Sequence, residues 1–365
     1  MELSGSVNHI ATERGHLEIK DSNNAVLESQ VTCYKNMDAA EAVVGWLKNN
    51  THHFPITAIG HRLVQGGPDH REPEMISDHL LLALHEYVYL APNHLPEEIN
   101  TIKTFRSAFP KIYQVACFDT FFHRDMPFYS KYYPLPAEYK DKGLMHYGFH
   151  GLSYEYVMHK LAGDDAAISK QKIIIAHLGN GAGMAAVQNG ISVETTMGLS
   201  PIGGLVMGTR SGDLDPGVLL FLLKQGRLTP TQLDDLLSKH SGLTAICGIS
   251  DMQELLKNET NNPKAKEALT VFCYHAKKFI GALAASMSGL DMVVFTGGIG
   301  ENSASIRERI CQDLEFLGIT ISEKQNHDMH EIISTEKSKV SVRVLKTNEE
   351  WMIARHTQDT IDKEN

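Results

Sequence analysis

The sequence has no long hydrophobic run, few cysteines and no excess of positive charge. Its apolar runs are short, with residues 218–223 typical, whereas a membrane-spanning helix needs about 20 apolar residues. The five cysteines are scattered and odd in number, which favours reduced thiols in a cytoplasmic protein over disulfides or a zinc site. The net charge of −10 argues against nucleic acid or an anionic membrane as the main partner.

Several familiar motifs are also missing. The sequence contains no export signal at its start, no Walker A run, no HExxH, no CxxC and no serine-centred GxSxG, which disfavours the chemistries that those motifs support. No repeat or low-complexity segment interrupts the chain. A length of 365 residues exceeds what one core normally holds and predicts two domains.

The pattern of apolar residues predicts alternating strands and helices, which indicates mixed α/β layers. We expect short antiparallel strands in residues 1–35, with turns at Gly15 and Asn23-Asn24. Prolines 127, 134 and 136 predict a non-helical connection and a domain junction. The predicted helices are 38–49, 76–90, 97–108, 151–162, several between 216 and 288, and one after residue 350; the predicted strands are 56–60, 111–118, 172–177, a hairpin about 188–190, and 341–345.

Two glycine-rich turns follow apolar, strand-like runs. Residues 173–176 lead into His177-Leu178-Gly179-Asn180-Gly181-Ala182-Gly183, and residues 292–295 lead into Thr296-Gly297-Gly298-Ile299-Gly300-Glu301-Asn302. Glycines at such a point let backbone N–H groups approach phosphate oxygens without a Cβ in the way. One such turn is also typical of ordinary structural turns, but two in one chain favour a nucleotide-phosphate site.

Two arginines lie beside flexible glycines. Arg62 follows the strand predicted at 56–60 and precedes Gly66-Gly67, and Arg210 lies in the loop 207–213, Met-Gly-Thr-Arg-Ser-Gly-Asp. Arginine suits planar, bidentate recognition of carboxylate or phosphoryl oxygens. A surface ion pair is the alternative for either residue, and the neighbouring glycines weaken it because a ligand could reach both side chains.

Three further side chains are placed where chemistry is common. His150 stands at the predicted start of a helix, in Tyr-Gly-Phe-His-Gly; the alternative is a structural histidine. Asp119 follows the strand predicted at 111–118, and the ends of strands are the usual position of functional carboxylates in open α/β sheets. The alternative is that Asp119 caps the N-terminus of the next segment. Glu349 follows the last strand and could approach a metal–phosphate complex, or it stabilises the first turn of a helix.

Taken together, these segments resemble the acetate/propionate kinase (acetokinase) family. The matching stretches occur in the family's order and are His61-Arg62 with Gly66-Gly67, residues 118–120, 147–151, 177–183, 207–216 (MGTRSGDLDP), 295–302 and 347–350. The resemblance implies the acetate and sugar kinase/Hsc70/actin superfamily, with two actin-like (ribonuclease H-like) α/β domains around a nucleotide cleft. One domain would comprise residues 1–123 plus 351–365, and the other residues 124–350.

The resemblance assigns four residues to the reaction, the ATP-dependent and reversible phosphorylation of acetate to acetyl phosphate. Arg62 and Arg210 look like the pair that holds the carboxylate and the transferring phosphoryl group. His150 looks like a hydrogen-bond donor to the transition state, and Asp119 like the catalytic carboxylate. Because a carboxylate substrate is already ionised at neutral pH, its attack needs no proton abstraction. We therefore expect Asp119 to orient an arginine or the metal shell.

The resemblance also implies binding contacts and partners. Asn93, Phe149 and Pro201 would line the pocket for the acyl group of acetate or another short-chain carboxylate, and Glu349 would be linked to Mg²⁺ or Mn²⁺. ATP or ADP is the expected co-substrate, and a homodimer is expected. The nucleotide contacts would be His177, Leu178, Gly179, Asn180, Gly181, Asp251, Met252, Gln253, Gly298, Ile299, Gly300, Glu301 and Asn302.

The sequence departs from the family in four places. Family members open with Asn-x-Gly-Ser-Ser-Ser-x-Lys, which contacts phosphate and metal, and no such segment occurs here. We therefore expect the chain as given to bind nucleotide weakly, turn over poorly and lose stability. Gln253 stands where an arginine is usual, Asn93 where an apolar residue is usual, and Gly183 where a serine is usual.

Two alternatives stay open at this point. A propionate kinase differs only in the pocket near Asn93, Phe149 and Pro201, and one extra methylene is worth only about 1–3 kcal/mol. A truncated, catalytically impaired nucleotide-binding relative is the alternative from another class, and it follows from the missing opening segment.

Overall fold

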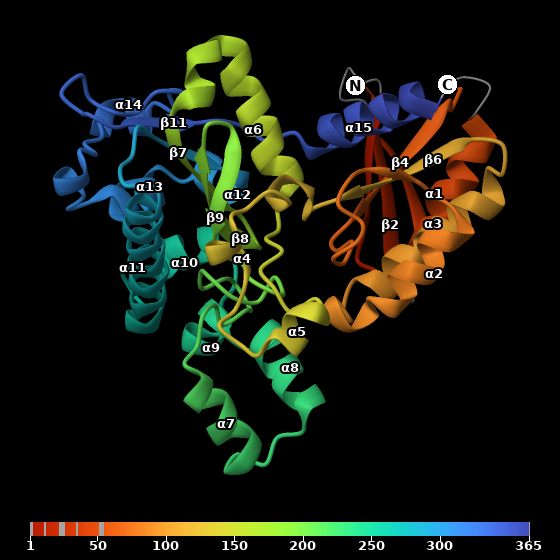
Figure 1. Cartoon of the computed structure of the whole chain (residues 1–365), viewed down its shortest axis with the longest axis horizontal. Coiled ribbons are helices and arrows are strands. Elements are labelled where there is room, and N and C mark those ends of the chain that lie inside the picture. The colour runs from red at the N-terminus through yellow and green to blue at the C-terminus, as the bar shows by residue number, and fades with distance from the viewer. Residues whose placement is uncertain (1–2, 11, 22–25, 34–35, 51–54, 365) are drawn as a thin grey trace. The chain divides into compact units, whose positions relative to one another are not determined.

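The chain divides into two compact units (Figure 1). The computed structural model describes residues 3–10, 12–21, 26–33, 36–50 and 55–364. One unit comprises Met1–Phe118 with Ile353–Asn365, and the other comprises Asp119–Met352. Helix α15 (Glu349–Glu364) begins in the second unit and ends in the first. Each unit is described by itself.

The unit of residues 1–118 and 353–365 contains two three-stranded sheets. One is antiparallel in the order β1-β2-β3, and the other has the order β4-β6-β5. β4 and β6 pair in parallel, which places Arg62 opposite Cys117. The elements are β1 (Leu3–Asn8), β2 (Thr12–Asp21), β3 (Val26–Cys33), α1 (Asn36–Asn50), β4 (Ala58–Leu63), β5 (Glu74–Met75), α2 (Asp78–Glu86), η1 (Val88–Leu90), α3 (Leu95–Ala108) and β6 (Tyr113–Phe118).

The antiparallel strands predicted for residues 1–35 are confirmed, but the turn predicted at Gly15 is wrong. Gly15 lies inside β2, where the pairing with β3 shifts register between Thr12 and Gly15. A Cβ on Gly15 would lie 2.5 Å from the carbonyl oxygen of Val31, so the glycine permits close approach of the neighbouring strand. The predicted turn at Asn23-Asn24 lies outside the described residues.

The unit of residues 119–352 is built on a five-stranded sheet in the order β11-β10-β7-β8-β9. β10 is parallel to β7 and β11, while β8 is antiparallel to β7 and β9. The strands are β7 (Lys172–Leu178), β8 (Ala182–Gln188), β9 (Ile191–Thr195), β10 (Met292–Thr296) and β11 (Ser341–Val344).

Helices surround this sheet. The main ones are α6 (Gly151–Asp164), which packs on the sheet, and α11 (Pro263–Ser286), which contacts β7, β8 and β9; Figure 1 shows them on opposite sides of the strands. The others are η2 (Phe121–His123), α4 (Phe128–Lys131), α5 (Ala137–Asp141), η3 (Ala166–Lys170), α7 (Pro216–Lys224), α8 (Pro230–Lys239), α9 (Gly242–Cys247), α10 (Met252–Asn258), α12 (Gly297–Asn302), α13 (Ala304–Cys311), η4 (Glu315–Leu317) and α14 (Glu323–His327).

The core of this unit follows from the alternation of side chains along the strands. Ile173 and Ile175 of β7 and Val294 of β10 form one buried cluster with Val157 of α6. Ile174, which points to the other face of the sheet, is also fully buried. Strands covered on both faces read as continuous apolar runs, which is why residues 173–176 and 292–295 were recognisable in the sequence.

Two local predictions in this unit need correction. The connection expected to be non-helical contains α4 and α5, which begin directly after Pro127 and Pro136; proline is compatible with a helix start because its fixed φ and missing N–H cost nothing there. The turn predicted at 297–302 is the short helix α12. The hairpin predicted about residues 188–190 is confirmed, with Asn189 and Gly190 at positive φ, as a type I′ turn requires.

The cysteines and the helices can be compared with what the sequence suggested. Among the described residues, the five cysteines form no disulfide, and all but Cys247 are buried. Among the described residues, no helix is long and apolar enough to cross a membrane.

A buried histidine holds the segment before α6. His123 is 1% exposed, and its Nε2 lies 3.1 Å from the carbonyl oxygen of Phe149. Because a carbonyl only accepts, Nε2 carries the proton, and Nδ1 accepts from the Ser192 hydroxyl at 2.8 Å. A Cβ on Gly148, at φ 70°, would lie 2.4 Å from the His123 ring. Burial lowers the pKa of His123 from 6.5 to about 4, so the side chain is neutral at neutral pH.

We predict that His123 makes the unit sensitive to acid. The folded pKa lies below the unfolded value, so the unfolded state binds more protons between pH 6.5 and about 4. Stability from this group is therefore present above pH 6.5 and falls as pH drops towards 4, by at most about 1.4 kcal/mol per pH unit. Urea unfolding across this range should show a shallower pH slope for His123→Gln than for the native sequence.

The control is His240→Gln, since His240 is exposed on the surface. It should keep the native slope. An unchanged slope in a folded His123→Gln variant would contradict a neutral buried imidazole at this position.

Candidate functional site

The first glycine-rich segment forms the tight hairpin between β7 and β8. The N–H of Gly179 donates to the carbonyl of Gly181 at 3.0 Å, and Asn180 is exposed at the tip. A Cβ on Gly181 would lie 3.3 Å from the ring of His150 and 3.6 Å from Nη1 of Arg210. The hairpin therefore lies against two of the predicted reaction residues, and a side chain at Gly181 would crowd the His150 ring and contact the Arg210 guanidinium.

His150 occupies a strained turn between β6 and α6. Its backbone has φ 60°, in the left-handed region, and it is the N-cap of α6. The next N–H, of Gly151, donates to the carbonyl of Asp119 at 2.8 Å, and a Cβ on Gly151 would lie 2.1 Å from that oxygen. Asp119 is 1% exposed at the end of β6. A non-glycine residue in this region costs about 1–3 kcal/mol, and such residues cluster at functional sites.

His150, His177 and Glu349 converge. The two imidazole rings stack with centroids 4.3 Å apart at 12°, and one ligand atom of each of the three side chains lies within 4.8 Å of the others. Ser153 Oγ lies 2.8 Å from Nδ1 of His177 and fixes that ring. Burial, and then the charges of Asp119 and Glu349, raise the pKa of Tyr154 well above its usual range, so Tyr154 stays a neutral phenol beside these acids.

Arg210 and Pro201 are also brought together. Nη1 of Arg210 donates to the carbonyl of Pro201 at 3.1 Å. Burial holds part of the Arg210 side chain out of water and lowers the pKa of its guanidinium below the usual range. Phe149, another predicted pocket residue, is 2% exposed, and its carbonyl is held by His123.

A cavity of about 480 Å³ joins the three predicted nucleotide segments. Its volume is within the range of ligand sites, about 300–1,000 Å³. The predicted residues that line it are Gly179, Asn180, Asp251, Met252, Gln253, Gly298, Ile299 and Asn302, and those not predicted are Gly208, Leu243, Ser250, Leu256, Phe272 and Ser303. Segments up to about 120 residues apart in sequence thus meet at one cavity.

Not every predicted nucleotide residue lines this cavity. Leu178 is fully buried in β7 and Gly300 is buried in α12. The Glu301 carboxylate accepts from the backbone N–H groups of Gly297 at 3.0 Å and Thr347 at 3.1 Å. Glu301 therefore ties the start of α12 to the segment that follows β11, which is a structural task.

Arg307, which no pattern in the sequence marks as important, stabilises the same segment. Its side chain is fully buried, and Nη1 donates to the carbonyls of Gly300 at 2.8 Å and Glu301 at 2.9 Å. Nε donates to Oδ1 of Asn326 at 2.8 Å. An arginine in an amphipathic helix normally indicates a solvated face, so only the fold shows that this one supports a loop.

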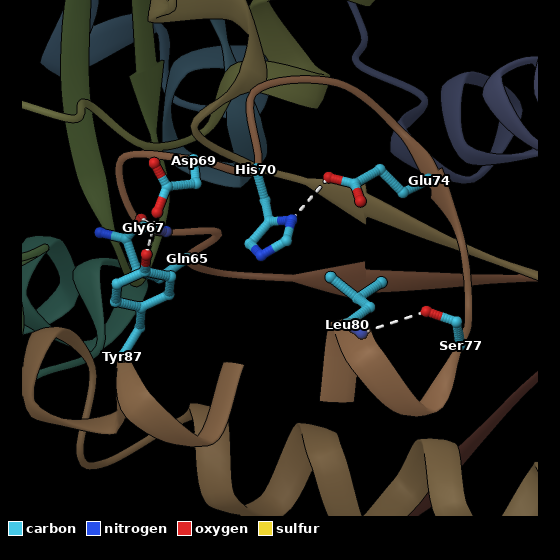
Figure 2. Close-up of polar contacts among 8 residues, drawn as sticks. All are labelled: Gln65, Gly67, Asp69, His70, Glu74, Ser77, Leu80 and Tyr87. Carbon is cyan, nitrogen blue, oxygen red and sulfur yellow. Dashed lines mark hydrogen bonds and ion pairs between the residues drawn. The ribbon is translucent and has the colours of Figure 1, made fainter. Parts of the chain in front are cut away.

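Arg62 and Asn93 lie in the other unit. Arg62 is within β4, one residue before its end, and Asn93 is exposed in the turn before α3. The loop after Arg62 is held by its own side chains (Figure 2): Gln65 Oε1 accepts from the N–H of Gly67 at 2.9 Å, and Tyr87 donates to Asp69. A Cβ on Gly67, at φ 69°, would lie 2.4 Å from the Tyr87 ring, so this position requires glycine.

The same loop continues into a charged pair. Figure 2 shows His70 pointing towards Glu74, with Nδ1 2.7 Å from the carboxylate. The Glu74 carboxylate raises the pKa of His70. The ring also stacks on Phe118 at the end of β6, with centroids 6.2 Å apart. The loop that follows Arg62 is therefore ordered by packing and hydrogen bonds within its own unit.

Comparison with known proteins agrees with the motifs. Residues 1–355 match the model of the acetokinase family. An acetate kinase of Methylocella silvestris is 41% identical over 327 residues, which cover 89% of this chain and 80% of that protein.

Solved structures extend the likeness to the fold. An acetate kinase of Porphyromonas gingivalis superposes with a TM-score of 0.89 at 36% identity, covering 99% of this chain and 93% of that one. A propionate kinase of Francisella tularensis superposes with a TM-score of 0.92 at 36% identity, covering 98% and 93%. The predicted fold class, two actin-like α/β domains, is confirmed by these neighbours. The resemblance seen in the sequence is likewise confirmed, and the chain belongs to the acetokinase family.

Proposed function

We propose that this acetate kinase transfers the γ-phosphoryl group of ATP directly to the carboxylate of acetate, using the residues around the β7–β8 hairpin. The family makes ATP or ADP the co-substrate and requires a divalent metal. Direct transfer suits the substrate, because a carboxylate is already ionised at neutral pH and needs no base. The protein's task is then positioning and charge stabilisation.

The observation that carries this proposal is the cavity shared by three segments. Gly179-Asn180, Asp251–Gln253 and Gly298-Ile299 line it together. Glycines without a Cβ let phosphate oxygens come close to the backbone, and the buried Met252 and Phe272 offer an apolar wall for a base. A nucleotide seated there would direct its phosphates along the hairpin that contacts His150 and Arg210.

We assign the charge-stabilising roles to Arg210 and His150. Both approach Gly181 of the hairpin, and a partly buried guanidinium stabilises developing charge more than a solvated one. Asp119, tied to the His150 turn through Gly151, would orient these donors and would not need to remove a proton. Phe149 and Pro201 would border the acyl group.

Arg62 and Asn93 enter the proposal on the family resemblance. Arg62 is the second arginine of the pair expected to hold the carboxylate, and the ordered loop after it supports a fixed position within its own unit. We also propose that the two compact units correspond to the two domains of the family, which the sequence places at 1–123 plus 351–365 and at 124–350.

The metal is proposed to be Mg²⁺ or Mn²⁺, held by Glu349 together with the phosphates of the nucleotide. Mg²⁺ is usually bound through one or two carboxylates plus substrate phosphates and water, and the half-buried Glu349 lies close to the histidines at the hairpin. The bound ion would neutralise charge on the transferring phosphoryl group. A cytoplasmic location and a role in acetyl-CoA biosynthesis stay predictions.

The curated relatives are named acetate kinases, which supports acetate over propionate as the proposed substrate. We predict that a version of the chain carrying the family's opening segment, Asn-x-Gly-Ser-Ser-Ser-x-Lys, forms acyl phosphate from ATP, Mg²⁺ and acetate, which hydroxylamine traps as the hydroxamate. Its kcat/KM should be higher for acetate than for propionate. Arg210→Ala should lower kcat by about 100-fold, on the scale of one lost preorganised donor.

The matched control is Arg106→Ala, because Arg106 forms an exposed pair with Asp78 in the other unit. Its activity should equal that of the native sequence. Near-normal kcat in a folded Arg210→Ala variant would exclude the role given to Arg210, and the absence of acyl phosphate from every acid tested would exclude the proposed reaction.

We predict that Gly181→Ala lowers kcat by about 10-fold with little change in melting temperature. The added methyl group must fit 3.3 Å from the His150 ring and 3.6 Å from the Arg210 guanidinium, and small misplacements of reacting groups can cost about 100-fold in rate. Gly281→Ala in α11 is the control, since its Cβ meets no atom within 4 Å and alanine favours a helix. Equal kinetics for both variants would contradict the proposed contact.

We further propose a homodimer that buries helix α7. This helix has no buried residue, and Val218, Leu220 and Phe221 are 42%, 52% and 62% exposed. A helix that is apolar and yet open to solvent indicates a contact surface. Both copies would present the same surface, as a two-fold dimer requires.

We predict that Phe221→Asp converts a dimer to a monomer, because it places a charge in the buried interface. Sedimentation or light scattering should report the mass of two chains for the native sequence and of one for the variant. Phe316→Asp is the control, because Phe316 is also exposed, at 78%, but lies in η4. A Phe221→Asp variant that stays dimeric would show that α7 is not the interface.

A further inference from the structure

The cluster of His150, His177 and Glu349 has a donor set that transfer of a phosphoryl group does not explain. It offers two imidazole nitrogens and one carboxylate oxygen within 4.8 Å of one another. Among the described residues it is the one group of three or more such side chains with this spacing. Its members come from the start of α6, the end of β7 and the start of α15.

The chemistry of these donors selects a class of cation. Mg²⁺ prefers oxygen ligands in an octahedron and keeps several waters, so two imidazoles suit it poorly. Imidazole suits Zn²⁺, Cu²⁺, Ni²⁺ and Fe²⁺, and three protein ligands with one open position are typical of catalytic zinc sites. The cluster therefore differs from the Mg²⁺ site proposed above, although it shares Glu349 with it.

The orientation of His177 supports this reading. Its Nδ1 lies 2.8 Å from Ser153 Oγ, which leaves Nε2 as the ligand atom. Metal-bound histidines almost always have the other ring nitrogen held in this way, because the hydrogen bond fixes the tautomer and the ring plane. Metal–ligand bonds of about 2.0–2.2 Å in a tetrahedron place neighbouring ligand atoms about 3.3 Å from one another. The ligand atoms of the three side chains must therefore move closer together by about 1.5 Å or less, and the stacked rings must tilt.

The charges near the cluster are mixed. Arg210 and His150 both approach Gly181 of the hairpin, and the positive charge of Arg210 disfavours binding of a cation. The charges of Asp119 and Glu349 both raise the pKa of Tyr154. The carboxylate of Asp119 is therefore a second acid within electrostatic range of the cluster. Two carboxylates against one guanidinium leave a net negative charge here, so the protein offsets part of the charge of a divalent ion without any nucleotide.

We propose that, in the nucleotide-free chain, His150, His177 and Glu349 bind a borderline divalent cation, with Zn²⁺ as its representative, and that this ion inhibits the enzyme by competing with the metal–nucleotide complex. Zn²⁺ would engage the proposed transition-state donor His150 and the proposed Mg²⁺ ligand Glu349 at once. The inhibition rests on the proposed function; the binding does not.

The experiment is a calorimetric titration of the nucleotide-free chain with Zn²⁺ near neutral pH, repeated with Mg²⁺. Zn²⁺ should bind at one tight site and Mg²⁺ far more weakly. His177→Ala and Glu349→Gln should each weaken Zn²⁺ binding by at least about 10-fold, and Ser153→Ala by about 10-fold, as loss of an orienting partner does. The absorption spectrum of bound Co²⁺ should report four-coordination in the native chain and change in these variants.

Two histidine variants are the controls. His240→Ala removes an exposed histidine that pairs with Asp235. His159→Ala removes a ring that stacks on Trp351, two residues after Glu349, with the ring centroids 4.7 Å apart. Both should keep native affinity for Zn²⁺. Because His177 lies in β7, the independent variant Glu349→Gln, on α15, keeps the test valid if His177→Ala is unstable.

The outcomes separate the two proposals. Native Zn²⁺ affinity in folded Glu349→Gln and Ser153→Ala variants, or equal affinity for Mg²⁺, would overturn the site, whatever the activity. At buffered free Zn²⁺, the apparent KM for Mg–ATP should rise while kcat at saturation is unchanged. Inhibition that lowers kcat alone would overturn competition, whereas tight Zn²⁺ binding in a chain that makes no acyl phosphate would leave the site standing and remove the proposed function.

Discussion

The candidate site depends on the left-handed turn at His150. A hydrogen bond from Gly151 holds the carbonyl of Asp119, and the neutral His123 holds the carbonyl of Phe149 on the other side of the turn. These contacts offset the strain of φ 60° at a non-glycine residue. Without them, the imidazole of His150 would not be directed at the hairpin.

Glycines in the β7–β8 hairpin and in α12 allow neighbouring side chains and backbone to lie close to these two segments. Gly181 leaves space for His150 and Arg210, while Gly297, at φ 76°, lies against the backbone of Leu178. Buried polar side chains then hold these segments: Arg307 binds two carbonyls of α12, and Glu301 binds the backbone on either side. Preorganised donors of this kind cost no rearrangement during the reaction.

The same geometry allows two kinds of metal chemistry at one place. On the two proposals above, Glu349 with nucleotide phosphates would be an oxygen-rich site, and Glu349 with His150 and His177 would be a nitrogen-rich one. Which ion binds would be decided by whether the nucleotide is present, because the phosphates supply the oxygen ligands that the protein alone lacks. One carboxylate thus serves two exclusive arrangements.

The sequence by itself determined most strands, most helices and which residues are candidates for the site. Continuous apolar runs such as 173–176 are local signals, and so are glycines after a strand and an arginine beside them. It also determined the family, because the order of motifs is a property of the chain. It misplaced Gly15 and the short helices α4, α5 and α12, where neighbouring strands and packing override weak local preferences.

Only the tertiary structure decided which of these residues meet. The cavity between Gly179, Gln253 and Gly298, the stacking of His150 on His177 and the burial of Arg307 join segments far apart in the sequence. No periodicity records such distances, since they result from how the sheet, α6 and α12 pack. The sequence names the groups that carry chemistry, and the fold sets their spacing, charge and access to a ligand.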